Sequence, residues 1–303
     1  MKMTSKTIVF FGSGPVAAAS LRSLFDNFEI EAVITKAVPA HHKESAPVET
    51  LAKELDLNLF FANTKQKLDE LMSSQNFKSP LGLIVDFGVI VSEKTIAAFP
   101  LGIVNSHFSL LPQWRGADPI TFAILSGQTK TGVSLMLIEP TLDTGKLLVQ
   151  KSLPIQPDDT IHSLTNRLVE FSNELLIEYL PRYMAGEIRP LRQSHPDRAT
   201  YSRLLTKQDG IIDWTKPAEV IEREIRAFAG WPGSRTTLAG KDVIITKAYA
   251  TPTQPPQALD IVSQIGAIGI VTGKGTLWVQ QLKPAGKKEM SATAFLAGYR
   301  QFL

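Results

Sequence analysis

The sequence predicts an α/β fold in two parts, a Rossmann-like, mostly parallel sheet followed by a small OB-like β-barrel domain. Over the first part of the 303-residue chain, apolar segments of strand length alternate with helical patterns, the order typical of a parallel sheet with helices between its strands. The strand segments, such as LGLIVD at residues 81–86, are apolar nearly throughout, as expected when helices cover both faces of the sheet. Near the C-terminus, short β segments are separated by glycine turns, a pattern typical of small barrels.

The strands and helices of the first part follow one another from residue 7. We predict strands at residues 7–11, 30–35, 59–61 and 81–86, with a fifth leading through 102–104 to Asn105, and helices at 16–25, 48–55, 65–73 and 95–99. A helix at 119–126, a strand at 131–138 and its hairpin partner at 146–153 come next. A long helix then begins after Asp158, where acidic residues suit the positive end of the helix dipole.

The pattern changes after residue 188. Residues 189–203 are polar, contain two prolines and are interpreted as a linker. Beyond them we predict a helix at 217–228, β segments at 243–246, 267–272 and 276–282, and a final helix from Ser291 to about Phe302. The expected division is therefore a first domain at 1–188, a linker at 189–206 and a barrel domain at 207–303.

Composition excludes several classes of chemistry. The chain has no cysteine, which rules out disulfides, thiolate metal sites and cysteine nucleophiles. Its histidines show no spacing typical of metal ligands, so we expect no metal. No apolar run approaches the roughly 20 residues of a membrane span, and the N-terminal apolar run is interrupted at Gly12, which is too early for a signal peptide. We expect a cytoplasmic protein that does not enter the membrane.

The net charge of +3 is unevenly distributed. Residues 204–303 carry 12 Lys and Arg against 8 Asp and Glu, whereas residues 1–203 carry 20 against 21. The basic excess thus lies in the C-terminal third of the chain. An excess of this size is compatible with a polyanionic partner, although a solvated basic surface is the simpler explanation on charge alone.

A glycine loop follows the first strand. Residues 12–17 (GSGPVA) satisfy the pattern G-x-G-x-x-G/A, which in many α/β proteins binds a dinucleotide. That site also needs an acidic residue, or an arginine for NADP, at the end of the second strand, where this chain has Thr35 and Lys36. Pro15 removes a backbone donor where a phosphate would sit. A tight strand-to-helix turn is the favoured interpretation.

The most informative segment is Asn105–Gly116, NSHFSLLPQWRG. Asn105 and His107 are two residues apart, so on a strand they point to the same face. There the amide can hold the oxygen of a carbonyl while the imidazole handles charge or a proton. Asp143 follows in a turn-forming Asp-Thr-Gly and can orient the imidazole or accept a proton. Because no cysteine and no serine elbow motif is present, the residues indicate direct acyl transfer between two bound substrates.

These segments carry a family resemblance. NSHFSLLPQWRGADPI followed by TGVSLMLIEPTLDTG resembles the formyltransferases that use 10-formyltetrahydrofolate. Three later segments, TYSRLLTKQDGIIDW (200–214), IRAFAGWPG (225–233) and LKPAGKKEMS (282–291), are similar to those of methionyl-tRNA formyltransferases. The motifs extend over nearly the whole chain in the family's order. The resemblance implies transfer of a formyl group from the folate to the α-amino group of initiator methionyl-tRNA.

The resemblance also implies roles for individual residues. Asn105 would donate to the formyl oxygen, His107 would support that oxygen as an oxyanion, and Asp143 would orient His107 and help to carry the proton lost by the amine. The tetrahydrofolate, which is a co-substrate, would be lined by four consecutive residues, Ser109, Leu110, Leu111 and Pro112.

Basic residues would contact the tRNA in such an enzyme. Lys287 and Lys288 would meet phosphates from the barrel, and Lys36 and Lys43 belong to the loop that the family places against the acceptor stem. Here that loop is short, which puts the acceptor-stem contact in doubt. Asp86 also departs from the family, whose sequence at 86–88 is like Ala-Tyr-Gly; this carboxylate adds a pterin contact or is a local hydrogen-bonding residue.

Three other functions compete with this one. A sugar-nucleotide N-formyltransferase would use the same folate donor and a different amine, but the segment PAGKKEMS and the C-terminal basic excess count against it. An NADP-dependent oxidoreductase built on the glycine loop has only Lys36 in its favour. A non-catalytic tRNA- or folate-binding protein would not need Asn105, His107 and Asp143 together. We expect the protein to be a monomer.

Overall fold

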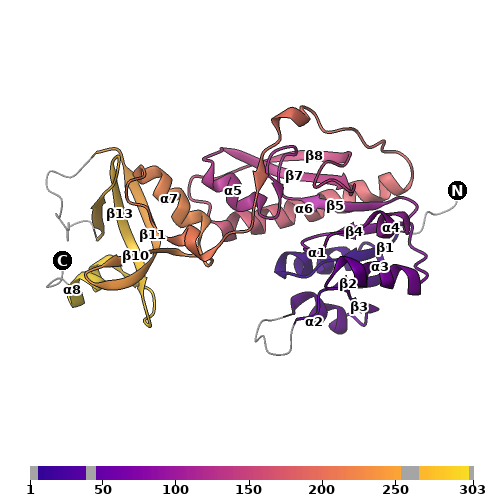
Figure 1. Ribbon diagram of the computed structural model, residues 1–303, viewed down its shortest axis with the longest axis horizontal. Helices are drawn as coiled ribbons and strands as arrows, with labels where there is room; N and C mark the ends of the chain where they lie inside the picture. The colour runs from indigo at the N-terminus through magenta and orange to yellow at the C-terminus, as the bar shows by residue number, and fades with distance from the viewer. Residues whose placement is uncertain (1–5, 39–45, 254–265, 300–303) are drawn as a thin grey trace. The chain divides into compact units, whose positions relative to one another are not determined.

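The computed structural model describes residues 6–38, 46–253 and 266–299, which form two compact units (Figure 1). The N-terminal unit comprises the residues up to 119 together with 130–154 and 165–202. The C-terminal unit comprises 120–129, 155–164 and the chain from 203 onward. The polar segment at 189–203 therefore clusters with the N-terminal unit almost to its end.

A seven-stranded sheet with the order β3-β2-β1-β4-β5-β7-β8 forms the centre of the N-terminal unit. Its strands are β1 (Thr7–Phe11), β2 (Glu29–Thr35), β3 (Leu59–Phe61), β4 (Leu81–Ile84), β5 (Ile103–His107), β7 (Lys130–Leu137) and β8 (Leu147–Pro154). Strands β1 to β5 are mutually parallel, whereas β7 is antiparallel to β5 and β8 to β7. The mostly parallel sheet expected from the sequence is confirmed.

Helices lie on both sides of this sheet (Figure 1). They are α1 (Pro15–Phe25), α2 (Pro47–Glu54), α3 (Lys65–Ser74), α4 (Glu93–Ala97) and α6 (Ile161–Met184). Helix α5 (Pro119–Leu125) precedes β7 in the chain, and its residues from Ile120 onward belong to the C-terminal unit. Val9 and Phe11 of β1 join a buried cluster with Leu68 of α3. Because side chains alternate along a strand, Ile8 and Phe10 are buried on the opposite face. Two buried faces explain the nearly continuous apolar strands.

One helix begins earlier than the sequence predicts. Helix α4 begins at Glu93 rather than at Thr95, because the hydroxyl of Ser92 caps its N-terminus by accepting the backbone N–H of Thr95 at 3.1 Å. The Ser92 hydroxyl at the same time donates to the Asp69 carboxylate. The capping serine, and not the apolar run that follows it, sets the start of the helix.

The C-terminal unit carries a second sheet, which is antiparallel, with the order β10-β11-β13-β12 and with β14 paired to β13. Its elements are α7 (Ala218–Ala227), β10 (Ser234–Leu238), β11 (Lys241–Thr251), β12 (Ile268–Val271), β13 (Thr276–Pro284), β14 (Met290–Ser291) and α8 (Ala292–Tyr299). This small antiparallel domain after the parallel one agrees with the predicted OB-like fold class.

The second sheet is larger than the sequence indicates. Strand β10 was not expected, because its sequence SRTTL is largely polar, and β11 continues well beyond the predicted 243–246. Val243 and Ile245 of β11 belong to a buried cluster that includes Ile221 of α7 and Phe295 of α8, whereas from β10 only Leu238 packs against this cluster. The hairpin turn at 273–275 and the Ser291 cap, which accepts the backbone N–H of Ala294 at 3.2 Å, are confirmed. Tertiary packing thus overrides the weak local propensity of β10.

No helix in the part of the chain that the structure describes is long and apolar enough to cross a membrane.

Candidate active site

Strand β5 places the two residues that the sequence singled out. Asn105 and His107 lie on the same face of this strand, inside it rather than beyond its end. Antiparallel pairing sets Asn105 opposite Met136 and His107 opposite Ser134 of β7. Asn105 is partly exposed, and its side chain makes no hydrogen bond within the described residues. Its amide is therefore available to an oxygen outside the protein.

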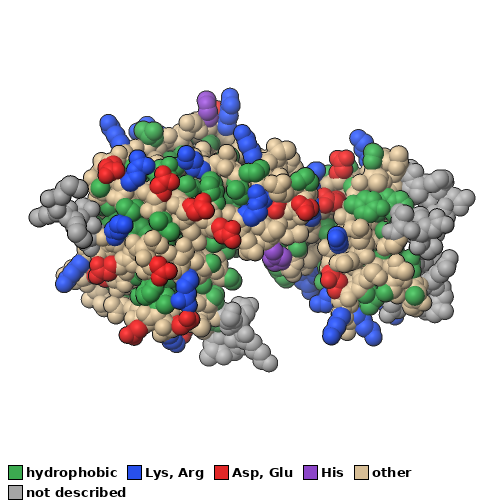
Figure 2. Space-filling model, turned by 180° about the vertical axis from the view of Figure 1, so that it is seen from behind, with side chains coloured by type: hydrophobic (Ala, Val, Ile, Leu, Met, Phe, Trp, Pro, Cys, Tyr) green, Lys and Arg blue, Asp and Glu red, His purple; other side chains and the backbone are tan. Residues whose placement is uncertain are grey.

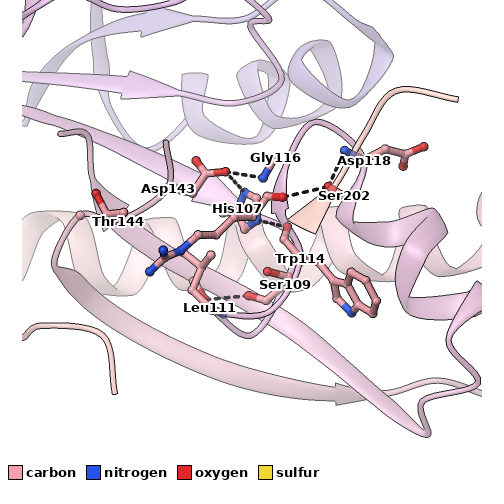
Figure 3. Close-up of polar contacts among 12 residues, drawn as sticks. His107, Ser109, Leu111, Trp114, Gly116, Asp118, Asp143, Thr144 and Ser202 are labelled. Carbon is pink, nitrogen blue, oxygen red and sulfur yellow. Dashed lines mark hydrogen bonds and ion pairs between the residues drawn. The ribbon is translucent and has the colours of Figure 1, made fainter. Parts of the chain in front are cut away.

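His107 and Asp143 point toward one another in this site (Figure 3). His107 is only 5% exposed, and its Nδ1 lies 3.9 Å from Oδ2 of Asp143. The same Oδ2 accepts the backbone N–H of Gly116 at 2.7 Å. Asp143 has a φ of +51°, in the left-handed region that is unusual for a residue other than glycine. The structure thus brings the predicted imidazole and carboxylate together from segments 36 positions apart.

The hydrogen bond made by the second ring nitrogen of His107 shows which nitrogen of the neutral ring carries the hydrogen. Nε2 lies 3.0 Å from the backbone oxygen of Trp114. A carbonyl oxygen can only accept, so Nε2 carries the hydrogen and, in the neutral ring, Nδ1 presents its lone pair toward Asp143. Burial lowers the pKa of His107, while the Asp143 carboxylate and the Trp114 carbonyl oppose this shift. Burial thus favours the neutral ring, and Asp143 is placed to stabilise a proton arriving at Nδ1.

The loop that follows β5 is held by its own hydrogen bonds. The Ser109 hydroxyl donates to the backbone oxygen of Gln113 at 2.5 Å. The Ser134 hydroxyl donates to the Ser109 carbonyl at 2.6 Å and accepts from the backbone N–H of Leu111 at 3.2 Å. Gln150 of β8 donates to the Leu111 carbonyl at 2.8 Å. These bonds hold the loop against β7 and β8.

Burial divides the four residues predicted to line the folate. Ser109 and Leu111 are buried, at 0% and 3% exposed, and they support the loop from within. Leu110 and Pro112 are half-buried, so they retain surface that a ligand can cover.

Asp86 lies just beyond the end of β4, against the glycine loop. Ile84, the last residue of β4, pairs with Asn105 of β5. Asp86 lies two residues after Ile84, just as His107 lies two residues after Asn105. Its carboxylate occupies the space beside Gly14 that any larger side chain there would need. Burial raises the pKa of Asp86, and the positive charge of Lys36 partly opposes this shift.

The glycine loop itself is a tight turn. A side chain on Gly12 would overlap with Ala17, Phe10 and the carbonyl of Val85. The loop is therefore needed for close packing between β1, β4 and α1, in agreement with the interpretation favoured from the sequence.

Of the basic residues predicted to contact tRNA, two lie on one exposed turn. Lys287 and Lys288 follow β13 at its turn into β14, and neither forms an ion pair within the described ranges. Lys36 follows β2, and its ammonium group lies beside Gly88. Lys43 lies outside the described residues. Figure 2 shows Lys and Arg side chains gathered at one edge of the C-terminal unit, whereas charges of both signs are interspersed on the N-terminal unit.

Sequence reasoning missed a second layer of this site. Two short strands, β6 (Arg115–Gly116) and β9 (Tyr201–Ser202), pair in parallel, so the segment interpreted as a linker is tied to the loop after β5. The Thr200 hydroxyl accepts the backbone N–H of Trp114 at 2.9 Å, and the Ser202 hydroxyl accepts that of Asp118 at 3.1 Å (Figure 3). Single polar residues in a polar segment give no periodic signal that could have predicted these contacts.

Comparison with known proteins shows the family to which this chain belongs. Residues 6–180 match the formyl transferase family, and residues 204–300 match the formyl transferase C-terminal domain. The chain belongs to the formyl transferase family. This confirms the resemblance seen in the sequence and removes the basis for an oxidoreductase. Within the described residues of this formyl transferase, no group of three or more His, Asp and Glu side chains could hold a metal ion.

Relatives of this formyl transferase extend over nearly its full length. The methionyl-tRNA formyltransferase of Roseiflexus castenholzii is 34% identical over 98% of this chain and 97% of its own. That of Chloroflexus aurantiacus is 35% identical over 96% of both chains. Together with the family match, this similarity makes the chain an enzyme of formyl transfer.

Solved structures show the same fold at much lower identity. An N-formyltransferase from Helicobacter canadensis, determined with folinic acid and dTDP-3-aminofucose, has a TM-score of 0.68 at 18% identity and covers 91% of this chain and 98% of that one. HypX from Aquifex aeolicus with tetrahydrofolic acid has a TM-score of 0.63 at 16% identity over 96% of this chain. The present chain spans 47% of that longer protein.

Proposed function

We propose that this formyl transferase moves the formyl group of 10-formyltetrahydrofolate to the α-amino group of initiator methionyl-tRNA. The observation that carries the proposal is the placement of His107, Asp143 and Asn105, whose side chain makes no hydrogen bond among the described residues, at one end of the sheet. The chain is also 34% identical to a methionyl-tRNA formyltransferase over almost its whole length. The protein would act as a monomer in the cytoplasm.

The reaction begins with attack by the neutral amine. A free α-amine has a pKa of about 7.7–8.0, so a useful fraction is neutral near pH 7. Its nitrogen attacks the formyl carbon, a new C–N bond forms, and the carbonyl oxygen becomes an oxyanion. The side-chain amide of Asn105 donates to that oxygen, and the stabilisation is largest in the transition state, where the negative charge develops.

His107 and Asp143 handle the proton. The amine nitrogen becomes positively charged on attack and must lose a proton. The neutral imidazole takes it at Nδ1, which faces Asp143 at 3.9 Å, and the carboxylate stabilises the imidazolium that results. This positive charge supports the oxyanion until the bond from the carbon to N10 breaks. The imidazolium of His107 then returns its proton to the leaving folate nitrogen, and the carbonyl of the new formamide reforms.

The folate is proposed to lie against the loop after β5. Leu110 and Pro112 offer partly exposed apolar surface, while the buried Ser109 and Leu111 shape the loop beneath it. Asp86, at the carboxyl edge of the same sheet, is proposed to add a polar contact to the pterin. Ligands of open α/β sheets bind at this edge.

The tRNA is proposed to contact basic residues of both units. Lys287 and Lys288 stand exposed on one turn, where they can meet phosphates without losing an ion pair to any of the described residues. Lys36 and Lys43 are proposed to contribute from the segment after β2. Such contacts add affinity that does not depend on base sequence and weakens with salt.

A formyl-transfer assay tests the proposal. The purified enzyme is supplied with 10-formyltetrahydrofolate and, in separate reactions, charged initiator methionyl-tRNA, charged elongator methionyl-tRNA or a dTDP-amino sugar. We expect formylmethionine on the initiator tRNA, with a kcat/KM above that for the elongator tRNA. Formylation of the amino sugar alone would replace the proposed acceptor, and no transfer to any amine would refute the function.

A further inference from the structure

Gln193 lies in the polar segment after α6, and the fold places it beside the Asp143 turn. Two residues earlier, Leu191 forms an antiparallel bridge with Leu147 at the start of β8, with hydrogen bonds of 2.7 and 2.9 Å between their backbones. This bridge fixes where the segment crosses the sheet. Gln193 itself is only 7% exposed, so its polar side chain must find partners within the protein.

The side-chain amide of Gln193 forms hydrogen bonds through both its nitrogen and its oxygen. Its Nε2 donates to the backbone oxygen of Asp143 at 2.7 Å and to that of Gly145 at 3.0 Å. Its Oε1 accepts from Nη2 of Arg115 at 2.8 Å. One side chain therefore connects the turn that carries the proposed catalytic carboxylate with the loop that follows β5.

The hydrogen bonds of Gln193 stabilise an unfavourable backbone conformation at Asp143. Asp143 has a φ of +51°, a conformation that costs a non-glycine residue free energy unless its surroundings impose it. Gln193 holds the carbonyls on both sides of Thr144, while the Gly116 N–H holds the Asp143 carboxylate. The turn is fixed from its backbone and from its side chain, which sets the direction of the carboxylate toward His107.

The choice of an amide also has an electrostatic consequence. Arg115 is buried, its Nε has no hydrogen-bond partner, and no carboxylate among the described residues pairs with it. A glutamate at 193 would pair with this guanidinium but would lose the donor to the two carbonyls. It would also add a second negative charge beside Asp143. Glutamine keeps Asp143 as the nearby carboxylate that acts on His107.

We propose that Gln193 is a positioning residue of the formyl-transfer site, which holds the Asp143 turn so that its carboxylate faces His107. Gln193 does not touch the reacting atoms and acts through Asp143. The inference rests on the proposed function, because it matters only if the Asp143–His107 pair takes part in the reaction.

Two substitutions at this position test the proposal. Gln193→Met keeps the length of the side chain and removes all three hydrogen bonds. Gln193→Glu keeps a partner for Arg115, and so protects the fold, but cannot donate to Asp143 and Gly145. Tyr183→Phe is the matched control, because it removes another side-chain-to-backbone bond of the same unit, from Tyr183 to the Leu101 carbonyl at 2.8 Å.

We measure kcat, the KM for the folate, thermal unfolding and the pKa of His107 by NMR. Displacing a reacting group by about 1 Å can cost on the order of 10²-fold in rate, so we expect both Gln193 variants to lose about that much kcat with little change in KM. The His107 pKa should fall in Gln193→Met, because a displaced Asp143 carboxylate opposes the effect of burial less, whereas Tyr183→Phe should change only the unfolding temperature.

The outcomes separate the two proposals. If both Gln193 variants keep the wild-type kcat, Gln193→Met keeps the wild-type His107 pKa and the variants only unfold at a lower temperature, Gln193 is merely structural and the inference is wrong. If Gln193→Met does not fold, Gln193→Glu alone decides. Asp143→Asn is measured in parallel: a wild-type kcat there would refute the proposed role of Asp143, whereas a loss there with normal Gln193 variants would refute only the role of Gln193.

Discussion

The carboxyl edge of the first sheet and the basic turn of the second differ in how they present charge. At the sheet edge, His107 is buried, and the nearby Asp143 is held by hydrogen bonds from Gly116 and Gln193. On the turn after β13, Lys287 and Lys288 are exposed and unpaired among the described residues. Buried groups interact through a medium of low dielectric, where geometry decides the energy. Exposed charges act over a screening length of about 8 Å at physiological salt, where their number decides more than their exact position.

This contrast indicates a division of labour. The proposed chemistry needs a few groups whose direction is fixed before the substrate arrives, and the buried His107 and the nearby Asp143 of the N-terminal unit are the groups proposed for it. Binding a polyanion needs positive charge that can adjust to it, and an exposed turn provides that. Substitutions in the first region should therefore change kcat sharply, while those in the second should change affinity gradually and in a salt-dependent way.

The largest effect is expected from Asn105→Ala. Removing one oxyanion donor typically lowers kcat by about 10²–10³-fold, and Asn105 makes no side-chain hydrogen bond in the described structure whose loss would unfold the protein. Steady-state kinetics and thermal unfolding measure both properties. Asn58→Ala, which removes an amide bonded to the Glu31 carbonyl at 3.0 Å away from the site, is the control. Near-wild-type turnover of the Asn105 variant would contradict the proposed mechanism.

Leu282→Ala should lower the stability of the protein without changing its affinity for the folate. Leu282 is fully buried in the core of the C-terminal unit, and such truncations cost about 2–5 kcal/mol. Chemical denaturation should show that loss, while the dissociation constant of a folate analogue stays unchanged because its proposed site lies in the other unit. The exposed neighbour Gln281→Ala should leave both unchanged. A large loss of folate affinity in Leu282→Ala would show that the two regions are coupled.

The pH dependence of His107 sharpens the comparison further. Burial lowers its pKa, so the folded protein binds this proton more weakly than the unfolded chain does. Stability should therefore fall as the pH drops below about 6.5, the ordinary pKa of the imidazole. Asp143→Asn should lower the His107 pKa further, because the carboxylate opposes the shift.

NMR titration of the imidazole tests this sign, with His107→Gln to assign the resonance. Denaturation at two pH values on either side of 6.5 tests the stability, again with His107→Gln, in which the part of the loss due to His107 should vanish. A His107 pKa above 6.5 would show that the Asp143 carboxylate outweighs burial, contrary to the expected sign.

The smallest effect is expected on the basic turn. Replacing Lys287 and Lys288 together by alanine should raise the KM for tRNA with little change in kcat. The slope of log affinity against log salt should fall by about one for each lysine that contacts a phosphate. Lys53→Ala is the control, because Lys53 is already paired with Glu49 at 2.6 Å. An unchanged salt slope in the double variant would remove this turn from the proposed tRNA surface.

Much of the fold follows from local patterns. Strands with two buried faces are apolar throughout, as in β1 and β4, and the motif on β5 is compact enough to read directly. The Asp143 turn was likewise visible because Asp-Thr-Gly is a turn-forming sequence. In contrast, β10 was missed, since this largely polar strand depends on its antiparallel pairing with β11, which no local pattern of apolar residues reveals.

The sequence by itself determined the chemistry: which groups are available, on which strand two of them stand, and to which family the chain belongs. Only the tertiary structure decided how those groups are held. The 3.9 Å approach of His107 to Asp143 and the contacts of Gln193 join residues 36 to 78 positions apart. The burial that favours a neutral His107 ring is likewise a property of the fold. Such contacts leave no periodic trace in a sequence, because one hydrogen bond across a folded sheet needs only a suitable residue at each end.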